Sequence, residues 1–295
     1  MQYFYTPNFN PIIFKIGLVS LHWYGMMYIL GFLFAIWLLT HPRYPLNIFF
    51  NDRKDIEYLL FLNFLGVIIG GRVGYALFYQ WPFFYCQDIL WILKIWEGGM
   101  SFHGGLLGVI ISIKWFSYRK NQSFLKVSDF VVPAVPFGLG LGRLGNFING
   151  ELWGRVTFDV PWAMLFYNSF YQDLLVLETY PELEPLFNYY GALPRHPSQL
   201  YEMILEGIVL FILIYLFIYK PKPVGSISGL FLVLYGLFRL IAEFFRQPDN
   251  HIGLINHFFT LGQILSLPMI VSGGIIILCA YKKKLLSKIT LFKKM

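Results

Sequence analysis

Charged and amide side chains interrupt an apolar stretch of the sequence between residues 138 and 155. Arg143 lies in this stretch and is followed by Asn146, Asn149 and Glu151. In a helix, Arg143 and Asn146 would share one face. An arginine in the hydrocarbon region of a membrane costs roughly 2.5–3.5 kcal/mol, so a chain keeps one where it meets a partner, a cavity or an anion. Two interpretations stay open: an ion pair with a carboxylate on another helix, or a polar pocket for an anionic head group.

A second arginine occurs in a comparable setting near the end of a later apolar stretch. Tyr235, Arg239 and Glu243 are spaced four residues apart, so they lie on one helical face. The pair Arg239–Glu243 could simply neutralise charge. Alternatively, Arg239 and Arg143 together could clamp a phosphodiester, because a guanidinium donates two parallel hydrogen bonds in a fixed plane. Under the second hypothesis Arg246 and Glu151 would form the rim of the site.

Other side chains could act on a proton or on a head group. His103 stands among glycines, and a histidine is a natural general base for a thiol or hydroxyl, although a lone membrane histidine often only bonds two helices together. Tyr24 falls near the outer membrane interface, where aromatic residues are common and a head-group contact is feasible. Glu202 and Glu206 are both candidates for the carboxylate partner of Arg143.

Several chemistries find no support in the sequence. No GxSxG, HExxH or GxxxxGK[ST] motif is present, and the two cysteines form no CxxC or metal-ligand pattern. No metal or soluble cofactor is therefore expected. If the protein is an enzyme, we expect a substrate to bring the nucleophile.

The composition indicates which environment must position these residues. The chain has 295 residues, of which 57% are hydrophobic and only 13% charged, as is typical of a membrane protein. The net charge of +7 comes mainly from short loops and the C-terminus. This distribution favours contact with anionic membrane lipids rather than with nucleic acid.

The apolar periodicity predicts an all-α polytopic membrane protein with seven transmembrane helices. The expected spans are residues 18–40, 57–79, 97–117, 127–148, 199–219, 226–245 and 260–281. Pro133 and Pro136 predict a break in the fourth span. We expect one integral membrane domain over residues 1–295, with a small head formed by the loop 150–196. Residues 1–17 are expected to form a short extension, and His196 and Gln199 to cap the start of the fifth span.

The basic residues predict the orientation of these spans. With the N-terminus outside, fourteen lysines and arginines face the cytoplasm and five face outward. The positive-inside rule therefore places the C-terminus in the cytoplasm and the head outside. His103, Arg143 and Arg239 would then converge at a similar depth in the outer leaflet.

Four ordered blocks of the sequence resemble the bacterial prolipoprotein diacylglyceryl transferase family. They are GRLGNFINGELWG at 142–154, MSFHGGL at 100–106, RHPSQLYE at 195–202 and YGLFRLIAEFFR at 235–246. The likeness covers most of the chain and is weakest at 41–56, at 156–193 and after Ala280.

The resemblance implies an enzyme of the bacterial inner membrane with its active site toward the periplasmic leaflet. Such an enzyme moves the diacylglyceryl group of phosphatidylglycerol onto the lipobox cysteine of a prolipoprotein signal peptide, leaving a thioether and glycerol phosphate. The resemblance links these residues to activity or lipid binding: Tyr24, His103, Arg143, Asn146, Glu151, Gly154, Tyr235 and Arg239.

The residue types suit this chemistry. We expect Arg143 and Arg239 to hold the phosphate and Asn146 to bind a head-group hydroxyl or a phosphate oxygen. Glu151 would orient Arg143, while His103, with or without Tyr235, would help to deprotonate the thiol. A lipid phosphate oxygen or Tyr235 alone is a further candidate for the base. Two other hypotheses compete: a lipid or anion transporter with the same arginine clamp, and a chaperone-like receptor for signal peptides.

Overall fold

The computed structural model describes residues 3–7, 9–16, 19–46, 50, 52–79, 98–248, 253, 255 and 258–292. Most of these residues are helical. The bundle contains the helices α1 (Trp23–Thr40), α2 (Arg53–Tyr79), α3 (Phe102–Arg119), α4 (Phe124–Val131), α5 (Val135–Ile148), α9 (Leu210–Ile218), α10 (Ser226–Glu243) and α11 (Leu261–Phe292). The remaining helical segments are η5 (Val132–Ala134), η6 (Tyr167–Ser169), α6 (Phe170–Thr179), η7 (Pro181–Leu183), α7 (Glu184–Tyr190), α8 (Ser198–Glu202) and η8 (Met203–Val209).

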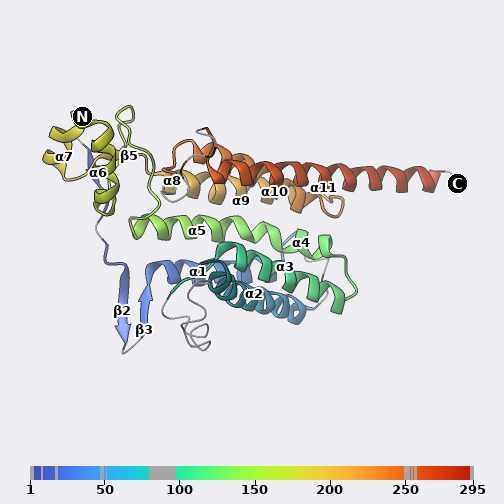
Figure 1. Ribbon diagram of the computed structural model, residues 1–295. Helices are drawn as coiled ribbons and strands as arrows, with labels where there is room; N and C mark the ends of the chain where they lie inside the picture. The colour runs from blue at the N-terminus through green and yellow to red at the C-terminus, as the bar shows by residue number, and fades with distance from the viewer. Residues whose placement is uncertain are drawn as a thin grey trace.

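The long helices run side by side, with the small helices α6 and α7 at one end of the bundle (Figure 1). Helix α5 packs against α1 and against η8, while α2 pairs with α3 and α10 with α11. The segments that contain Arg143, Glu202 and Arg239 belong to α5, α8 and α10. Contacts of α8 with both α5 and α10 bring these three segments together.

Six helical segments of the described chain are long and apolar enough to cross a membrane. They are Trp23–Thr40, Arg53–Phe78, Phe124–Ile148, Ser198–Ile218, Ser226–Glu243 and Leu261–Leu285. Six of the seven expected spans therefore correspond to one of these segments. The expected span 97–117 corresponds to α3, which carries His103, Lys114 and Arg119 and is not among the six. The coarse expectation of an all-α polytopic membrane protein is confirmed.

The N-terminal region differs from the expected short extension. Strands β2 (Ile12–Ile16) and β3 (Val19–His22) form an antiparallel hairpin, and helix α1 begins only at Trp23. The first predicted span therefore started too early. Residues 19–22 read Val-Ser-Leu-His, and four residues of alternating apolar and polar type directly before an apolar run are too few to distinguish a paired strand from the start of a helix.

Two of the spans are irregular. In the fourth, the 3₁₀ turn η5 contains Pro133 and separates α4 from α5, which confirms the predicted break. In the fifth, η8 is a π-helical segment between α8 and α9, and it contains the buried Glu206. The sequence did not predict this second irregularity. Such π segments often occur at functional sites.

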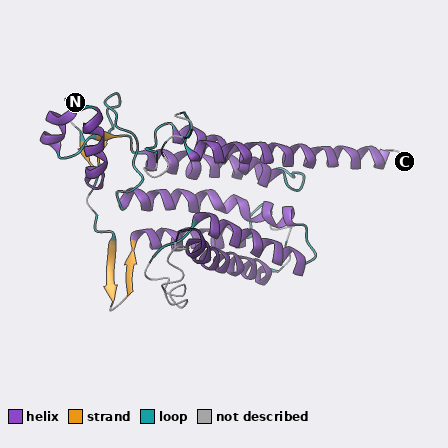
Figure 2. Cartoon of the chain, viewed as in Figure 1, coloured by secondary structure: helices purple, strands orange, loops and turns teal. Residues whose placement is uncertain are grey.

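The residues between α5 and α8 fold into a head together with the start of the chain. Strand β4 (Met164–Leu165) lies between β1 (Phe4–Tyr5), with which it is parallel, and β5 (Pro194–Arg195), with which it is antiparallel. Figure 2 shows these short strands beside the small helices. The head is therefore built from residues 150–196 and from an N-terminal strand.

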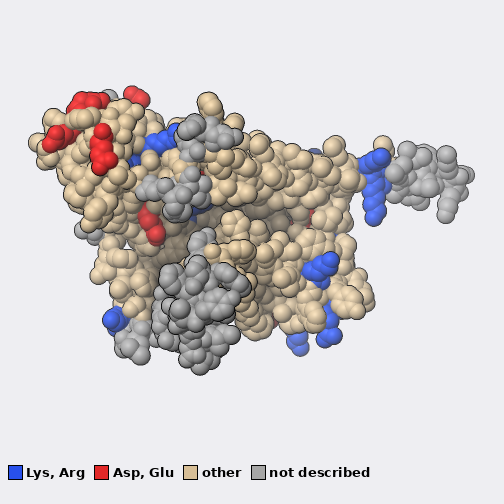
Figure 3. Space-filling view, in the orientation of Figure 1, with Lys and Arg blue, Asp and Glu red and all other residues tan. Residues whose placement is uncertain are grey.

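The two ends of the bundle differ in character. The main apolar core, which includes Phe116, Phe130 and Ile214, lies away from the head. Acidic side chains gather on the head in Figure 3, and basic ones at the opposite end of the bundle. At that opposite end, the Asp129 carboxylate accepts hydrogen bonds from the backbone N–H groups of Gly225 and Ser228, which anchors the start of α10.

Candidate active site

Arg143 and Arg239 meet at one shared carboxylate. The Nε atom of Arg143 lies 2.9 Å from Oε2 of Glu202, and Nη1 of Arg239 lies 2.7 Å from Oε1 of the same residue. The three residues come from α5, α10 and α8. The prediction that two guanidinium groups from separate helices converge is therefore confirmed, as is Glu202 as a partner of Arg143.

Three further side chains complete a network of six charges, here called the arginine cluster. Glu206 lies 3.4 Å from Nη2 of Arg143, and Glu243 lies 2.7 Å from Nη2 of Arg239. Arg246 reaches Oε1 of Glu202 at 3.2 Å. Three arginines thus face three glutamates, which makes the network neutral and lets it persist in an apolar setting. Arg246, expected at the rim, is instead 8% exposed and belongs to this network.

Exposure differs between the two kinds of charge. The side chains of Glu202 and Glu206 are fully buried, whereas those of Arg143 and Arg239 are 19% and 15% exposed. The carboxylates therefore lie beneath the guanidinium groups. Among the described residues, Nη1 of Arg143 and Nε of Arg239 have no carboxylate partner, so donors remain for an incoming anion.

Two tyrosines lie within the electrostatic reach of the cluster. Tyr235, half-buried and one helical turn before Arg239, interacts electrostatically with Glu206 and Arg143. Tyr24 interacts with Arg143 and Glu151, and its hydroxyl lies 3.1 Å from that of Tyr28. Both tyrosines were predicted to belong to the site, and the structure brings both to it.

Gly154 has a structural reason to be glycine. A Cβ atom there would lie 2.5 Å from the carbonyl oxygen of His196 and 2.6 Å from that of Phe245. The Gly154 N–H donates to the His196 carbonyl at 2.9 Å. Gly154 therefore joins the head to the end of α10, and it acts on the site through the backbone rather than through contact with the cluster.

Hydrogen bonds to its backbone carbonyl groups hold the loop that follows α5 in place. Six consecutive carbonyl oxygens, from Asn149 to Gly154, accept hydrogen bonds from residues that are distant in sequence. The donors are Asn168 for Asn149 and Gly150, Gln199 for Glu151, Ser198 for Leu152, the Gln247 N–H for Trp153 and Arg195 for Gly154. These contacts fix the path of the chain beyond Arg143 and Asn146.

Arg195 links this loop to the interior of the head. Its guanidinium lies 2.6 Å from the Asp173 carboxylate, and both side chains are fully buried. Burial lowers the pKa of Arg195, and the adjacent Asp173 carboxylate opposes that effect. The block RHPSQLYE did not predict Arg195 and Ser198 as positioning residues, and Asn168 lies outside any motif. Their role depends on backbone partners far along the chain, which a motif does not reveal.

Three expected contacts differ from those observed. Glu151 is exposed and accepts a hydrogen bond from Asn149 at 2.8 Å, while Glu202 and Glu206 orient Arg143. Gln199 does not cap the fifth span, because its amide donates to the Glu151 carbonyl instead. His196, also expected as a cap, has Tyr201 as its side-chain partner.

His103 and Asn146 take different positions relative to the cluster. Asn146 is 7% exposed and follows Arg143 on the same face of α5, as predicted. His103 is exposed in the first turn of α3, where its ring contacts Phe102. Within the described part of the chain, no hydrogen bond or ion pair joins His103 to the arginine cluster.

Comparison with known proteins gives the family of this chain. A family model described as "Prolipoprotein diacylglyceryl transferase" matches residues 11–279. The chain belongs to the prolipoprotein diacylglyceryl transferase family. Relatives named phosphatidylglycerol--prolipoprotein diacylglyceryl transferase include one from Blochmanniella floridana, 70% identical, with 96% of this chain and all of the relative covered. Those from Sodalis glossinidius and Serratia proteamaculans are each 56% identical, covering 96% of this chain and 97% of the relative.

Membership of the prolipoprotein diacylglyceryl transferase family makes this chain an enzyme, as the resemblance implied. Three of the four blocks that carried the resemblance supply five of the six charges of the arginine cluster: Arg143, Glu202, Arg239, Glu243 and Arg246. The sixth, Glu206, lies one turn beyond the third block. In this transferase these three blocks therefore meet at one place in the fold, whereas the block 100–106 contributes no charge to the cluster.

Proposed function

We propose that this transferase moves the diacylglyceryl group of phosphatidylglycerol onto the thiol of a lipobox cysteine in a prolipoprotein, at the periplasmic leaflet of the bacterial inner membrane. The observation that carries the proposal is the convergence of Arg143 and Arg239 on Glu202. Two guanidinium groups held side by side, each with donors to spare, suit the phosphodiester of one lipid.

The reaction requires one bond to form and one to break. The cysteine sulfur bonds to the terminal glycerol carbon of the diacylglyceryl group, and the bond from that carbon to the phosphate oxygen breaks. The electron pair leaves on the phosphate, so glycerol phosphate is released and a thioether remains. Arg143 and Arg239 would stabilise the charge that develops on the leaving phosphate. Stabilisation of this kind by fixed donors is usually the largest single contribution to the rate enhancement of an enzyme.

The buried carboxylates would keep the guanidinium groups in position between turnovers. Glu202 contacts both arginines, so it fixes their relative position before a lipid arrives. Because the carboxylates lie beneath, the phosphate would approach from the exposed side of the guanidinium groups. Asn146, on the same helical face as Arg143, would bind a head-group hydroxyl or phosphate oxygen.

The thiol must also lose its proton, because the thiolate is the nucleophile and a free thiol has a pKa of about 8.5. Tyr235 lies within the field of the cluster and would act as a relay, passing its own phenolic proton to an acceptor as it receives that of the thiol. The lipid phosphate itself is the other acceptor near the reacting sulfur. His103 keeps its proposed role only if a substrate brings the thiol to the start of α3.

The test is turnover by the purified protein. Incubation with phosphatidylglycerol and a lipobox peptide should add a diacylglyceryl group to the cysteine, seen as a mass gain of the peptide. A peptide with Cys→Ser at the lipobox position should gain nothing. Movement of lipid without any adduct would contradict the proposal and favour a transporter. No observation on the described residues favours a transporter over an enzyme.

A further inference from the structure

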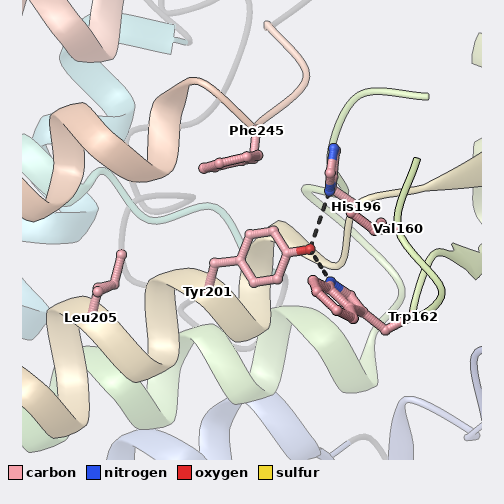
Figure 4. Close-up of a pocket in the computed structure, with 6 residues that line it drawn as sticks. All are labelled: Val160, Trp162, His196, Tyr201, Leu205 and Phe245. Carbon is pink, nitrogen blue, oxygen red and sulfur yellow. Dashed lines mark hydrogen bonds between the residues drawn. The ribbon is translucent and has the colours of Figure 1, made fainter. Parts of the chain in front are cut away.

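An open apolar pocket lies beside the arginine cluster, at the junction between head and bundle. It has a volume of about 280 Å³ and is lined by Val160, Trp162, His196, Tyr201, Leu205 and Phe245. Figure 4 shows Tyr201 at its centre, with Trp162, His196 and Phe245 arranged around the ring. A volume of this size would hold about nine water molecules, or an aliphatic side chain with room to spare.

The Tyr201 hydroxyl in the pocket is paired with two other lining side chains. The indole N–H of Trp162 donates to the Tyr201 hydroxyl at 2.7 Å, and that hydroxyl lies 3.1 Å from Nδ1 of His196. Burial lowers the pKa of His196, which favours the neutral ring and lets Nδ1 accept a hydrogen bond from the Tyr201 hydroxyl. The lining therefore presents carbon to an occupant and suits an apolar group.

The pocket and the cluster are built from adjacent residues. Tyr201 and Leu205 precede Glu202 and Glu206, so one helix turns two neighbouring faces to the two sites. Phe245 likewise precedes Arg246. Adjacent Cα atoms are about 3.8 Å apart, so the pocket and the cluster lie close together. If one polypeptide reached both, the residue in the pocket would be only a few positions along that polypeptide from the residue that reacts at the cluster.

The position of the pocket along the bundle decides between occupants. Val160 and Trp162 belong to the head, and Tyr201 lies in the first turn of the fifth span. The pocket thus extends from the level of the cluster toward the head. Acyl chains of a lipid whose phosphate sits at the cluster would run the other way, into the membrane. The glycerol head group of that lipid is polar and does not match an apolar lining.

We propose that the pocket receives an apolar side chain of the acceptor polypeptide, from a residue within about three positions of the reacting cysteine. The inference rests on the proposed transfer to a peptide thiol and adds a binding site for the peptide itself. The pocket would hold the acceptor in register, so that the sulfur lies over the lipid glycerol at the arginine cluster. Positioning of this kind accounts for much of the rate enhancement in reactions between two bound substrates.

The first experiment fills the pocket with a larger side chain at a lining residue that belongs to the head. Val160→Phe adds bulk at a residue of the head outside the arginine cluster, while Ile204→Phe adds a ring at an exposed position of η8, next to the lining residue Leu205, and serves as the control. An active acceptor peptide is compared with versions in which each residue within three positions of the cysteine is replaced by alanine. The wild-type enzyme should show one position where alanine lowers kcat/KM about tenfold.

In Val160→Phe that alanine penalty should disappear, because the unmodified peptide now binds no better than its alanine version. The KM for phosphatidylglycerol should stay the same, and Ile204→Phe should keep the full penalty. A raised KM for phosphatidylglycerol with an intact alanine penalty would overturn the proposal and assign the pocket to lipid. An unchanged penalty and an unchanged lipid KM would overturn it as well.

A second measurement does not depend on turnover or on the variants. A peptide with a photoactivatable leucine analogue at the sensitive position is irradiated with the wild-type protein, and the crosslinks are mapped by mass spectrometry. Where no position is sensitive, the analogue is scanned through all six flanking positions. Crosslinks to Trp162, Tyr201 or Leu205 support the proposal, and crosslinks that avoid all lining residues overturn it. Absence of any lipidated product would instead refute the proposed transfer.

Discussion

The Glu202 carboxylate holds both Arg143 and Arg239 in position. Glu202 is fully buried and contacts Arg143, Arg239 and Arg246, so no single arginine can be removed without leaving negative charge uncompensated. Loss of one partner of a buried pair costs about 3–5 kcal/mol. An alanine variant of either arginine would therefore combine a loss of function with a loss of stability.

Lysine variants separate these two effects. Arg143→Lys and Arg239→Lys keep the positive charge near Glu202 but lose the planar, bidentate donors. We expect each to retain most of the thermal stability of the parent and to lower kcat by about 10²-fold or more, as removal of a fixed donor to a developing anion does. Turnover of the peptide and thermal unfolding in detergent check this. Near-normal kcat in both variants would contradict a phosphate clamp.

Helix α10 carries Tyr235, Arg239 and Glu243, so the position of this helix sets the geometry of the cluster. Helix α11 packs closely on it: a Cβ atom at Gly273 would lie 2.6 Å from the Gly229 carbonyl oxygen. The next residue, Gly274, has open space around its Cβ position. The chain thus offers two adjacent glycines with opposite surroundings.

Alanine at these two positions should have opposite effects. Gly273→Ala must push α11 away from α10, and such overpacking costs about 1–3 kcal/mol. Gly274→Ala should be neutral or stabilise the helix by up to about 1 kcal/mol. Thermal unfolding of both variants in the same detergent measures the difference, and turnover shows whether the displacement reaches Arg239. Equal stability of the two variants would refute the close helix contact.

At the scale of the whole molecule, charge separates the two ends of the bundle. Acidic side chains gather on the head and basic ones at the opposite end, where Lys120 pairs with Asp55 at 2.6 Å. Basic loops remain on the cytoplasmic side of a membrane. We therefore expect the head to face the periplasm and the C-terminus the cytoplasm.

Reporter fusions in a bacterial cell test this orientation. Alkaline phosphatase fused after residue 295 should be inactive, and a green fluorescent protein at the same place should fluoresce. Alkaline phosphatase inserted in the head after the exposed Glu182 should be active. The reverse pattern would place the arginine cluster near the cytoplasmic leaflet and would contradict the proposed site of reaction.

The sequence by itself determined the membrane class, most of the spans, the break at Pro133 and the membership of Arg143, Glu202 and Arg239 in one site. These features follow from local composition and from charges that cannot lie alone in an apolar layer. Only the tertiary structure decided that Arg246 is buried in the cluster, that Glu151 does not orient Arg143, and that donors from the head, from α8 and from the segment after α10 hold six consecutive carbonyl groups of the loop after α5. Those outcomes depend on contacts between residues far apart along the chain, and no local pattern of residue types specifies which distant partner a buried polar group finds.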